Sequence, residues 1–87
     1  MATVVLPRSL MALFPSAPRQ LRVDGGTVAD VLDSVDREVP GLRNRLCDSR
    51  TSLRPHINVF VDGAPAQLGT IVSSDGVVHV IPAVSGG

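Results

Sequence analysis

Apolar and polar residues alternate with a period of two along several stretches of the chain, which is the pattern of strands with one buried face. Residues 2–6 are rich in β-branched side chains and stop at Pro7. Residues 20–24 and 57–62 alternate in the same way, and each stretch is followed by a glycine that favours a turn. We therefore expect strands at these three places, with the first two paired in a hairpin.

The end of the chain predicts one more strand. Val78 and Val80 alternate with polar or exposed positions, and Asp75-Gly76 before them is a turn signal. The region near Gln67-Leu68 carries only a weak pattern, so we expect a minor element there.

A helical period of apolar residues begins after Thr27. The residues with this spacing are Val28, Val31, Leu32, Val35 and Val39. Thr27 is a favourable N-cap, and Asp30 three residues later approaches a capping box, although the usual Glu or Gln is absent. Pro40-Gly41 ends the helix. Leu42 and Leu46 then indicate a short helical turn before an irregular segment through Pro55.

This order of elements predicts an α+β domain in which one main helix packs across a mixed sheet of four to five strands. The first and last strands are expected to lie parallel at its centre. The residues expected to form the core are Val4, Leu6, Leu21, Val23, Val28, Val31, Leu32, Val35, Leu42, Val59, Val61, Val78 and Val80. We assign residues 1–82 to this domain and residues 83–87 to a flexible tail.

The composition limits the classes of function. A chain of 87 residues leaves no room for a catalytic cleft of ordinary size, and its net charge of zero does not favour nucleic acid or an anionic membrane as partner. All eight basic residues are Arg. Biased codon usage is the simpler explanation, and the alternative is that a protein with a reactive C-terminus gains by offering itself no lysine amine.

The remaining reactive side chains give no catalytic or metal pattern. Cys47 cannot form an internal disulfide and is expected to fill a small apolar space, because it follows Leu46 at the end of a helical turn. His56 and His79 have no neighbouring cluster of cysteines or acids, so no metal or other bound cofactor is expected. No apolar leader or membrane-length run is present, which favours a cytoplasmic location. We expect the chain to be a monomer when alone.

The chain resembles the ThiS/MoaD sulfur carriers in several features taken together. These are the predicted order of elements, the segment Val-Pro-Gly-Leu at residues 39–42, the strand Asn-Val-Phe-Val-Asp-Gly at residues 58–63 and the C-terminal Gly-Gly. The resemblance covers nearly the whole chain and implies a ubiquitin-like β-grasp fold. Within the family, the ending Pro-Ala-Val-Ser-Gly-Gly is most similar to the CysO-type carrier of thiocarboxylate-dependent cysteine synthesis and to relatives that serve natural-product pathways.

The resemblance implies a protein cosubstrate rather than an enzyme. A ubiquitin-activating-type enzyme (ThiF/MoeB-like) uses ATP to adenylate the carboxylate of Gly87, sulfur displaces AMP, and the thiocarboxylate passes sulfur to a synthase. The tail that enters the partner comprises Pro82, Ala83, Val84, Ser85 and Gly86. Glycine suits this task because it lacks a Cβ that would obstruct a narrow channel.

The strand pattern also predicts a binding surface. If Val59, Val61, Val78 and Val80 face the helix, then Phe60, His79 and Ile81 point to the opposite face. An exposed large apolar group on such a small sheet is more often a partner-binding patch than incidental exposure.

Three other functions stay open at the level of sequence. The chain could be the small subunit of molybdopterin synthase, whose tail inserts into a large catalytic subunit. It could be a ubiquitin-like protein modifier joined through Gly87 to target lysines, or a β-grasp interaction module without tail chemistry.

The four arginines at 43, 45, 50 and 54 are interpreted as solvated charge rather than as a nucleic-acid site, because no aromatic stacking platform accompanies them.

Overall fold

The computed structural model describes residues 1–49 and 52–82. The helices are α1 (Arg8–Leu13), α2 (Val28–Glu38) and α3 (Leu42–Leu46). The strands are β1 (Ala2–Val5), β2 (Gln20–Val23), β3 (Gly26–Thr27), β4 (Cys47–Ser49), β5 (Ser52–Leu53), β6 (Ile57–Val61), β7 (Ala64–Ala66), β8 (Ile71–Val72) and β9 (Val77–Pro82).

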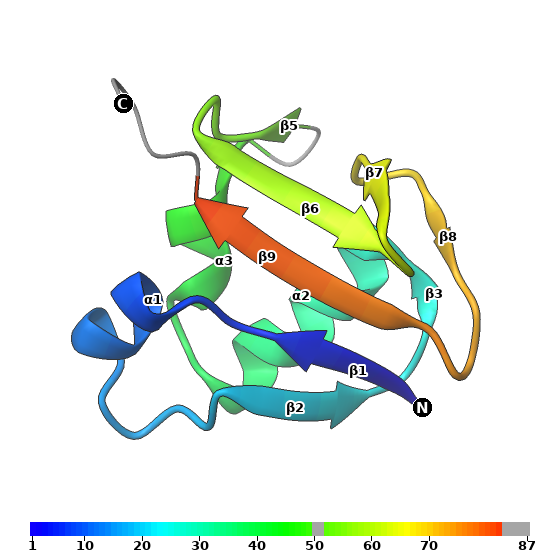
Figure 1. Cartoon of the computed structure of the whole chain (residues 1–87). Helices are drawn as coiled ribbons and strands as arrows, with labels where there is room; N and C mark the ends of the chain where they lie inside the picture. Colours follow the sequence, from blue (N-terminus) through cyan, green and yellow to red (C-terminus); the bar gives the residue numbers. More distant parts are fainter. Residues whose placement is uncertain (50–51, 83–87) are drawn as a thin grey trace.

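Five strands form the main sheet in the order β2-β1-β9-β6-β7. The central pair, β1 and β9, is parallel, and each other neighbouring pair is antiparallel. Helix α2 crosses one face of this sheet, while the face turned to the viewer in Figure 1 has no helix over it. The α+β, ubiquitin-like β-grasp prediction is therefore confirmed, including the parallel pairing of the first and last strands.

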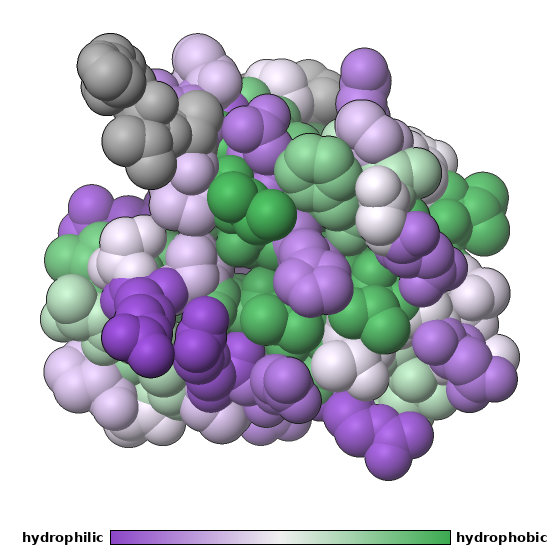
Figure 2. Space-filling view, viewed as in Figure 1, coloured by the Kyte–Doolittle hydropathy of each residue, from purple (hydrophilic) through white to green (hydrophobic). Residues whose placement is uncertain are grey.

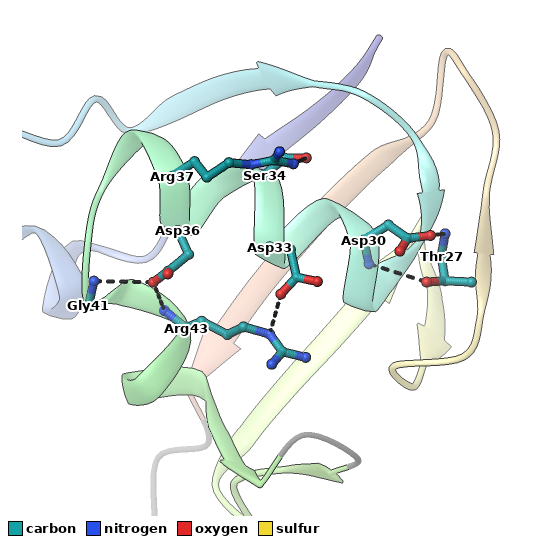
Figure 3. Close-up of polar contacts among 8 residues, drawn as sticks. All are labelled: Thr27, Asp30, Asp33, Ser34, Asp36, Arg37, Gly41 and Arg43. Carbon is teal, nitrogen blue, oxygen red and sulfur yellow. Dashed lines mark hydrogen bonds and ion pairs between the residues drawn. The ribbon is translucent and has the colours of Figure 1, made fainter.

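Helix α2 begins with a complete capping box (Figure 3). The Thr27 hydroxyl accepts a hydrogen bond from the Asp30 backbone N–H (3.2 Å), and the Asp30 carboxylate accepts one from the Thr27 backbone N–H (3.0 Å). Asp30 thus performs the role that Glu or Gln usually has, and its negative charge also suits the N-terminus of a helix. One face of the helix is buried against the sheet, as its apolar period predicts.

Two carboxylates of α2 contact the junction between α2 and α3 (Figure 3). The Asp36 side chain accepts hydrogen bonds from the backbone N–H groups of Gly41 (3.1 Å) and Arg43 (3.0 Å). Gly41 has a left-handed φ of 95°, which glycine adopts without strain. The Arg43 guanidinium then pairs with Asp33 of α2 at 3.0 Å. Arg43 is therefore a structural residue between the helices, which corrects its interpretation as solvated charge.

All thirteen residues predicted for the core are buried. The structure adds further buried apolar residues, which are Ala2, Leu10, Ala17, Val39, Leu46, Cys47, Leu68 and Val72. Burial of Cys47 confirms that this thiol fills a small apolar space. Among the described residues the buried set contains no polar or charged side chain, so packing of apolar groups accounts for the core.

Some elements differ from the prediction. Residues 8–13 form α1, for which no helix was predicted, and Leu10 of this helix is inserted into the core. The segment expected to be irregular contains the β4–β5 hairpin. The weak element near Gln67-Leu68 is instead a loop between β7 and β8, and β8 pairs with β3 in a separate two-stranded sheet.

Candidate functional site

The residues predicted as a binding patch lie together on the sheet face opposite α2. Phe60 of β6 and His79 of β9 are direct cross-strand partners, and Ile81 follows two residues after His79 on the same face. His79 and Ile81 are exposed, the latter to 45%. Phe60 is half-buried rather than exposed, because β6 has neighbours on both sides, with Pro65 of β7 opposite Phe60 on the second side.

The structure extends this patch with two residues that sequence reasoning missed. Val5 of β1 pairs with His79, and Val77 precedes His79 by two residues on the same face of β9. Both valines are half-buried. We call Val5, Phe60, Val77, His79 and Ile81 the outer sheet patch. Figure 2 shows the corresponding apolar surface gathered over β1, β9 and β6, with polar surface around it.

The strand that carries the patch also leads to the C-terminus. Pro82 is the last residue of β9, is half-buried and lies opposite Ile57 at the start of β6. Only two residues separate Pro82 from His79 along the strand. The predicted tail residues Ala83, Val84, Ser85, Gly86 and Gly87 lie outside the described residues. The fold therefore places the outer sheet patch directly before the tail.

Arg54 has structural partners as Arg43 does. Its guanidinium donates two hydrogen bonds to the backbone carbonyl of Asn44 (2.7 and 3.1 Å) and lies 3.7 Å from a carboxylate oxygen of Asp48. It borders a pocket of about 350 Å³ whose walls include Leu53, Ile57 and Leu68. These contacts tie the β4–β5 hairpin to α3 and bring no acid, base or nucleophile together.

The described residues do not form a catalytic or metal centre. Across residues 1–49 and 52–82 no group of three His, Cys, Asp or Glu side chains is placed to hold a metal ion. Burial raises the pKa of the Cys47 thiol, and the nearby Arg43 charge opposes that effect. In the same part of the chain no helix is long and apolar enough to cross a membrane.

Comparisons with known proteins agree with the fold. The model of the ThiS family matches residues 12–87. Small archaeal modifier protein 1 of Haloferax volcanii is 36% identical over 72 residues, which covers 79% of this chain and 83% of that protein.

Two solved structures have the same fold over essentially the whole chain. A chain in the crystal structure of the BexX/CysO complex of Amycolatopsis orientalis has a TM-score of 0.89 and 26% identity, with all of both chains covered. The crystal structure of CysO from Mycobacterium tuberculosis has a TM-score of 0.87 and covers 97% of this chain and all of that one, at 23% identity. The relatives are small carrier or modifier proteins rather than catalysts. The chain belongs to the ThiS family of ubiquitin-like sulfur carriers and small modifiers.

Proposed function

We propose that this protein is a sulfur carrier whose reactive group is the carboxylate of Gly87. A ubiquitin-activating-type partner uses ATP to convert that carboxylate to an acyl adenylate. Sulfide sulfur then bonds to the carbonyl carbon, AMP leaves, and the resulting thiocarboxylate donates sulfur in the biosynthesis of cysteine or another sulfur-containing metabolite. The carrier is a cosubstrate, and ATP is bound by the partner.

The observation that carries this proposal is the path of β9. The strand runs through the centre of the sheet beside β1 and β6 and reaches Pro82 immediately after the outer sheet patch. A partner that docks on this patch holds the start of the tail in a fixed place, since β9 is paired with β1 as far as His79 and with β6 as far as Pro82. The five residues after Pro82 span at most about 17 Å when extended, enough to enter a deep nucleotide site.

The outer sheet patch suits docking to that partner. Apolar side chains on its surface lose contact with water when covered, and ring-bearing residues such as Phe60 often contribute strongly at interfaces. The similarity to a chain of the BexX/CysO complex supports docking to a partner, because that complex joins two proteins. A sulfur-accepting synthase is the second partner we propose, reached by the same tail.

Protein modification is the second candidate, favoured by the similarity to small archaeal modifier protein 1. In that function the activated Gly87 carbonyl bonds to a lysine amine of another protein instead of to sulfur. Both functions share the adenylation step, so the acceptor decides between them.

The test is incubation of the chain with a ThiF/MoeB-like activating enzyme, ATP and sulfide, followed by intact mass measurement. A carrier shows one oxygen replaced by sulfur, and omission of ATP prevents that change. If instead the chain appears covalently attached to other proteins through isopeptide bonds and never acquires sulfur, the modifier function is correct and the carrier function is wrong.

A further inference from the structure

The activated form of this protein would be an electrophile, and the chain offers it few nucleophiles of its own. All eight basic side chains are Arg, whose guanidinium stays protonated and does not attack acyl groups. With no lysine in the sequence, the α-amino group of Met1 is the amine of the chain as given. Cys47 is the one thiol. An acyl group that passes to His56 or His79 gives an acyl-imidazole, which water hydrolyses. The places of the Met1 amine and the Cys47 thiol therefore decide whether the chain can form a lasting bond with itself.

The parallel pairing of β1 and β9 keeps the amine of Met1 far from the tail. Thr3 pairs with Val77, so the chain starts beside the beginning of β9, whereas the tail leaves from its other end at Pro82. Figure 1 shows the N-terminus and the arrowhead of β9 at opposite ends of the sheet. At about 3.3 Å per residue, the strand axis separates Met1 from Pro82 by about 23 Å. Five tail residues that turn back along the sheet reach at most about 17 Å.

Burial keeps the thiol of Cys47 out of contact with the activated tail. Cys47 is 7% exposed, at the start of β4 and inside the apolar core. Thiolates rather than thiols attack acyl groups, and burial raises the pKa of Cys47, which lowers the thiolate fraction near neutral pH. An acyl group on a five-residue tail cannot contact this sulfur unless the core opens.

We propose that the folded chain withholds its own amine and thiol from its activated C-terminus, so that the Gly87 carbonyl forms lasting bonds with external sulfur or amine donors and not with the chain that carries it. This inference rests on the proposed activation of Gly87. The suppressed reaction is ordinary acyl transfer: a nitrogen or sulfur of the chain bonds to the carbonyl carbon, the bond to the leaving group breaks, and a proton goes to water. A lasting bond between two copies can then form only between the tail of one copy and the amine of Met1, a residue that is 57% exposed, in the other.

The experiment uses the full chain prepared as a C-terminal thioester of 2-mercaptoethanesulfonate, which represents the activated carboxyl without an activating enzyme. Intact mass distinguishes hydrolysis from self-reaction, because a ring or a Cys47 thioester has lost the small thiol without gaining water. In native buffer we expect hydrolysis alone. In concentrated urea, where the ends meet and Cys47 is exposed, we expect the ring and the internal thioester.

Two lysine variants test whether position controls the reaction. His56 is exposed next to Ile57, the cross-strand partner of Pro82, so His56→Lys places an amine within reach of the tail. We expect this variant to form a ring in native buffer and to lose its thioester at least about tenfold faster than the wild type, because the reaction becomes intramolecular. Ser74→Lys is the matched control, in the exposed turn before β9 at the far end of the sheet, and is expected to behave as the wild type.

The inference is overturned if the native wild-type chain forms the ring or the Cys47 thioester as fast as it does in urea. It is equally overturned if His56→Lys loses its thioester no faster than the wild type, since amine position would then be irrelevant. Failure of an activating enzyme to charge Gly87 would refute the proposed function and would leave this chemical measurement unaffected, so the two failures are distinguishable.

Discussion

Phe60 and His79 lie directly opposite each other on the antiparallel strands β6 and β9, on the sheet face that α2 leaves uncovered. On its other side His79 pairs with Val5 of β1, so side chains from three strands meet in one surface. The same strand continues from His79 to Pro82, where the described chain ends. Strand β9 therefore connects the outer sheet patch, which a partner can cover, with the C-terminal tail, whose carboxylate that partner would adenylate.

A charge in the outer sheet patch is expected to impair docking without unfolding the protein. Ile81→Asp should lower the rate of adenylation by at least about tenfold, as loss of an interface hot spot does, because the carboxylate must be desolvated when the partner covers it. Melting temperature should change little, since Ile81 is 45% exposed. Ile71→Asp is the control, because Ile71 is 73% exposed on β8 outside the patch. Equal adenylation by the wild type and both variants would show that the patch has no part in activation.

The core prediction can be tested on β6, one residue from Phe60. Val59 is 2% exposed and faces α2, so Val59→Ala should lower the free energy of unfolding by about 1–3 kcal/mol through lost burial and the cavity left behind. Urea denaturation measures this change. Ile71→Ala removes more carbon atoms than Val59→Ala, but from an exposed site, and should lower the free energy of unfolding less. A larger decrease for Ile71→Ala than for Val59→Ala would contradict the assignment of Val59 to the buried face.

The capping box should make stability depend on pH in the acid range. The backbone hydrogen bond from Thr27, with a further contribution from its side chain, lowers the pKa of Asp30 below its ordinary value of 3.8. A carboxyl whose pKa is lower in the folded state stabilises the fold above its unfolded pKa, and that contribution is lost as pH falls through the folded value. The stability difference between the wild type and Asp30→Asn, measured by urea denaturation, should therefore be largest above about pH 4.5 and shrink below pH ~3.8. A difference that grows on acidification would contradict this sign.

The Asp36 carboxylate should contribute measurably to the junction of α2 and α3. Asp36→Ala leaves the part-buried backbone N–H groups of Gly41 and Arg43 without this acceptor, and we expect a loss of about 1–3 kcal/mol in the free energy of unfolding. Glu38→Ala, an exposed substitution at the end of the same helix, is the control and should stay within about 0.5 kcal/mol. A similar effect of the two substitutions in urea denaturation would show that Asp36 has no special role.

The sequence predicted those parts of the fold that periodicity determines. Helix α2 and the inward residues of β1, β2, β6 and β9 have regular spacing, and twelve of the thirteen core residues followed from it; Leu42 followed from the short helical turn predicted after Gly41. Helix α1 was missed because it has only six residues and follows Pro7 without a side-chain cap, so its formation depends on burial of Leu10. The short pairs β3–β8 and β4–β5 depend on long-range or irregular pairing that has no local signal.

The candidate site was predicted in part for the same reason. Phe60, His79 and Ile81 could be placed on one face from the alternation of two strands. Val77 lies two residues before His79 on β9, so the same alternation could have placed it on this face. Val5 joined the patch only once the register of β1 against β9 was known. The structural role of Arg43 likewise depends on the turn at Gly41, which brings the guanidinium to Asp33.

The central claim is that the carboxylate of Gly87 carries the sulfur. Its most direct test is the intact mass of three proteins after reaction with the activating enzyme, ATP and sulfide: the wild type, a chain lacking Gly87, and a chain with one alanine added after Gly87. The addition displaces the carboxylate by about 3.5 Å, and errors of even ~1 Å can lower rates by ~100-fold. We predict sulfur on the wild type alone, with all three proteins equally folded. Sulfur on the chain that lacks Gly87 would contradict the account.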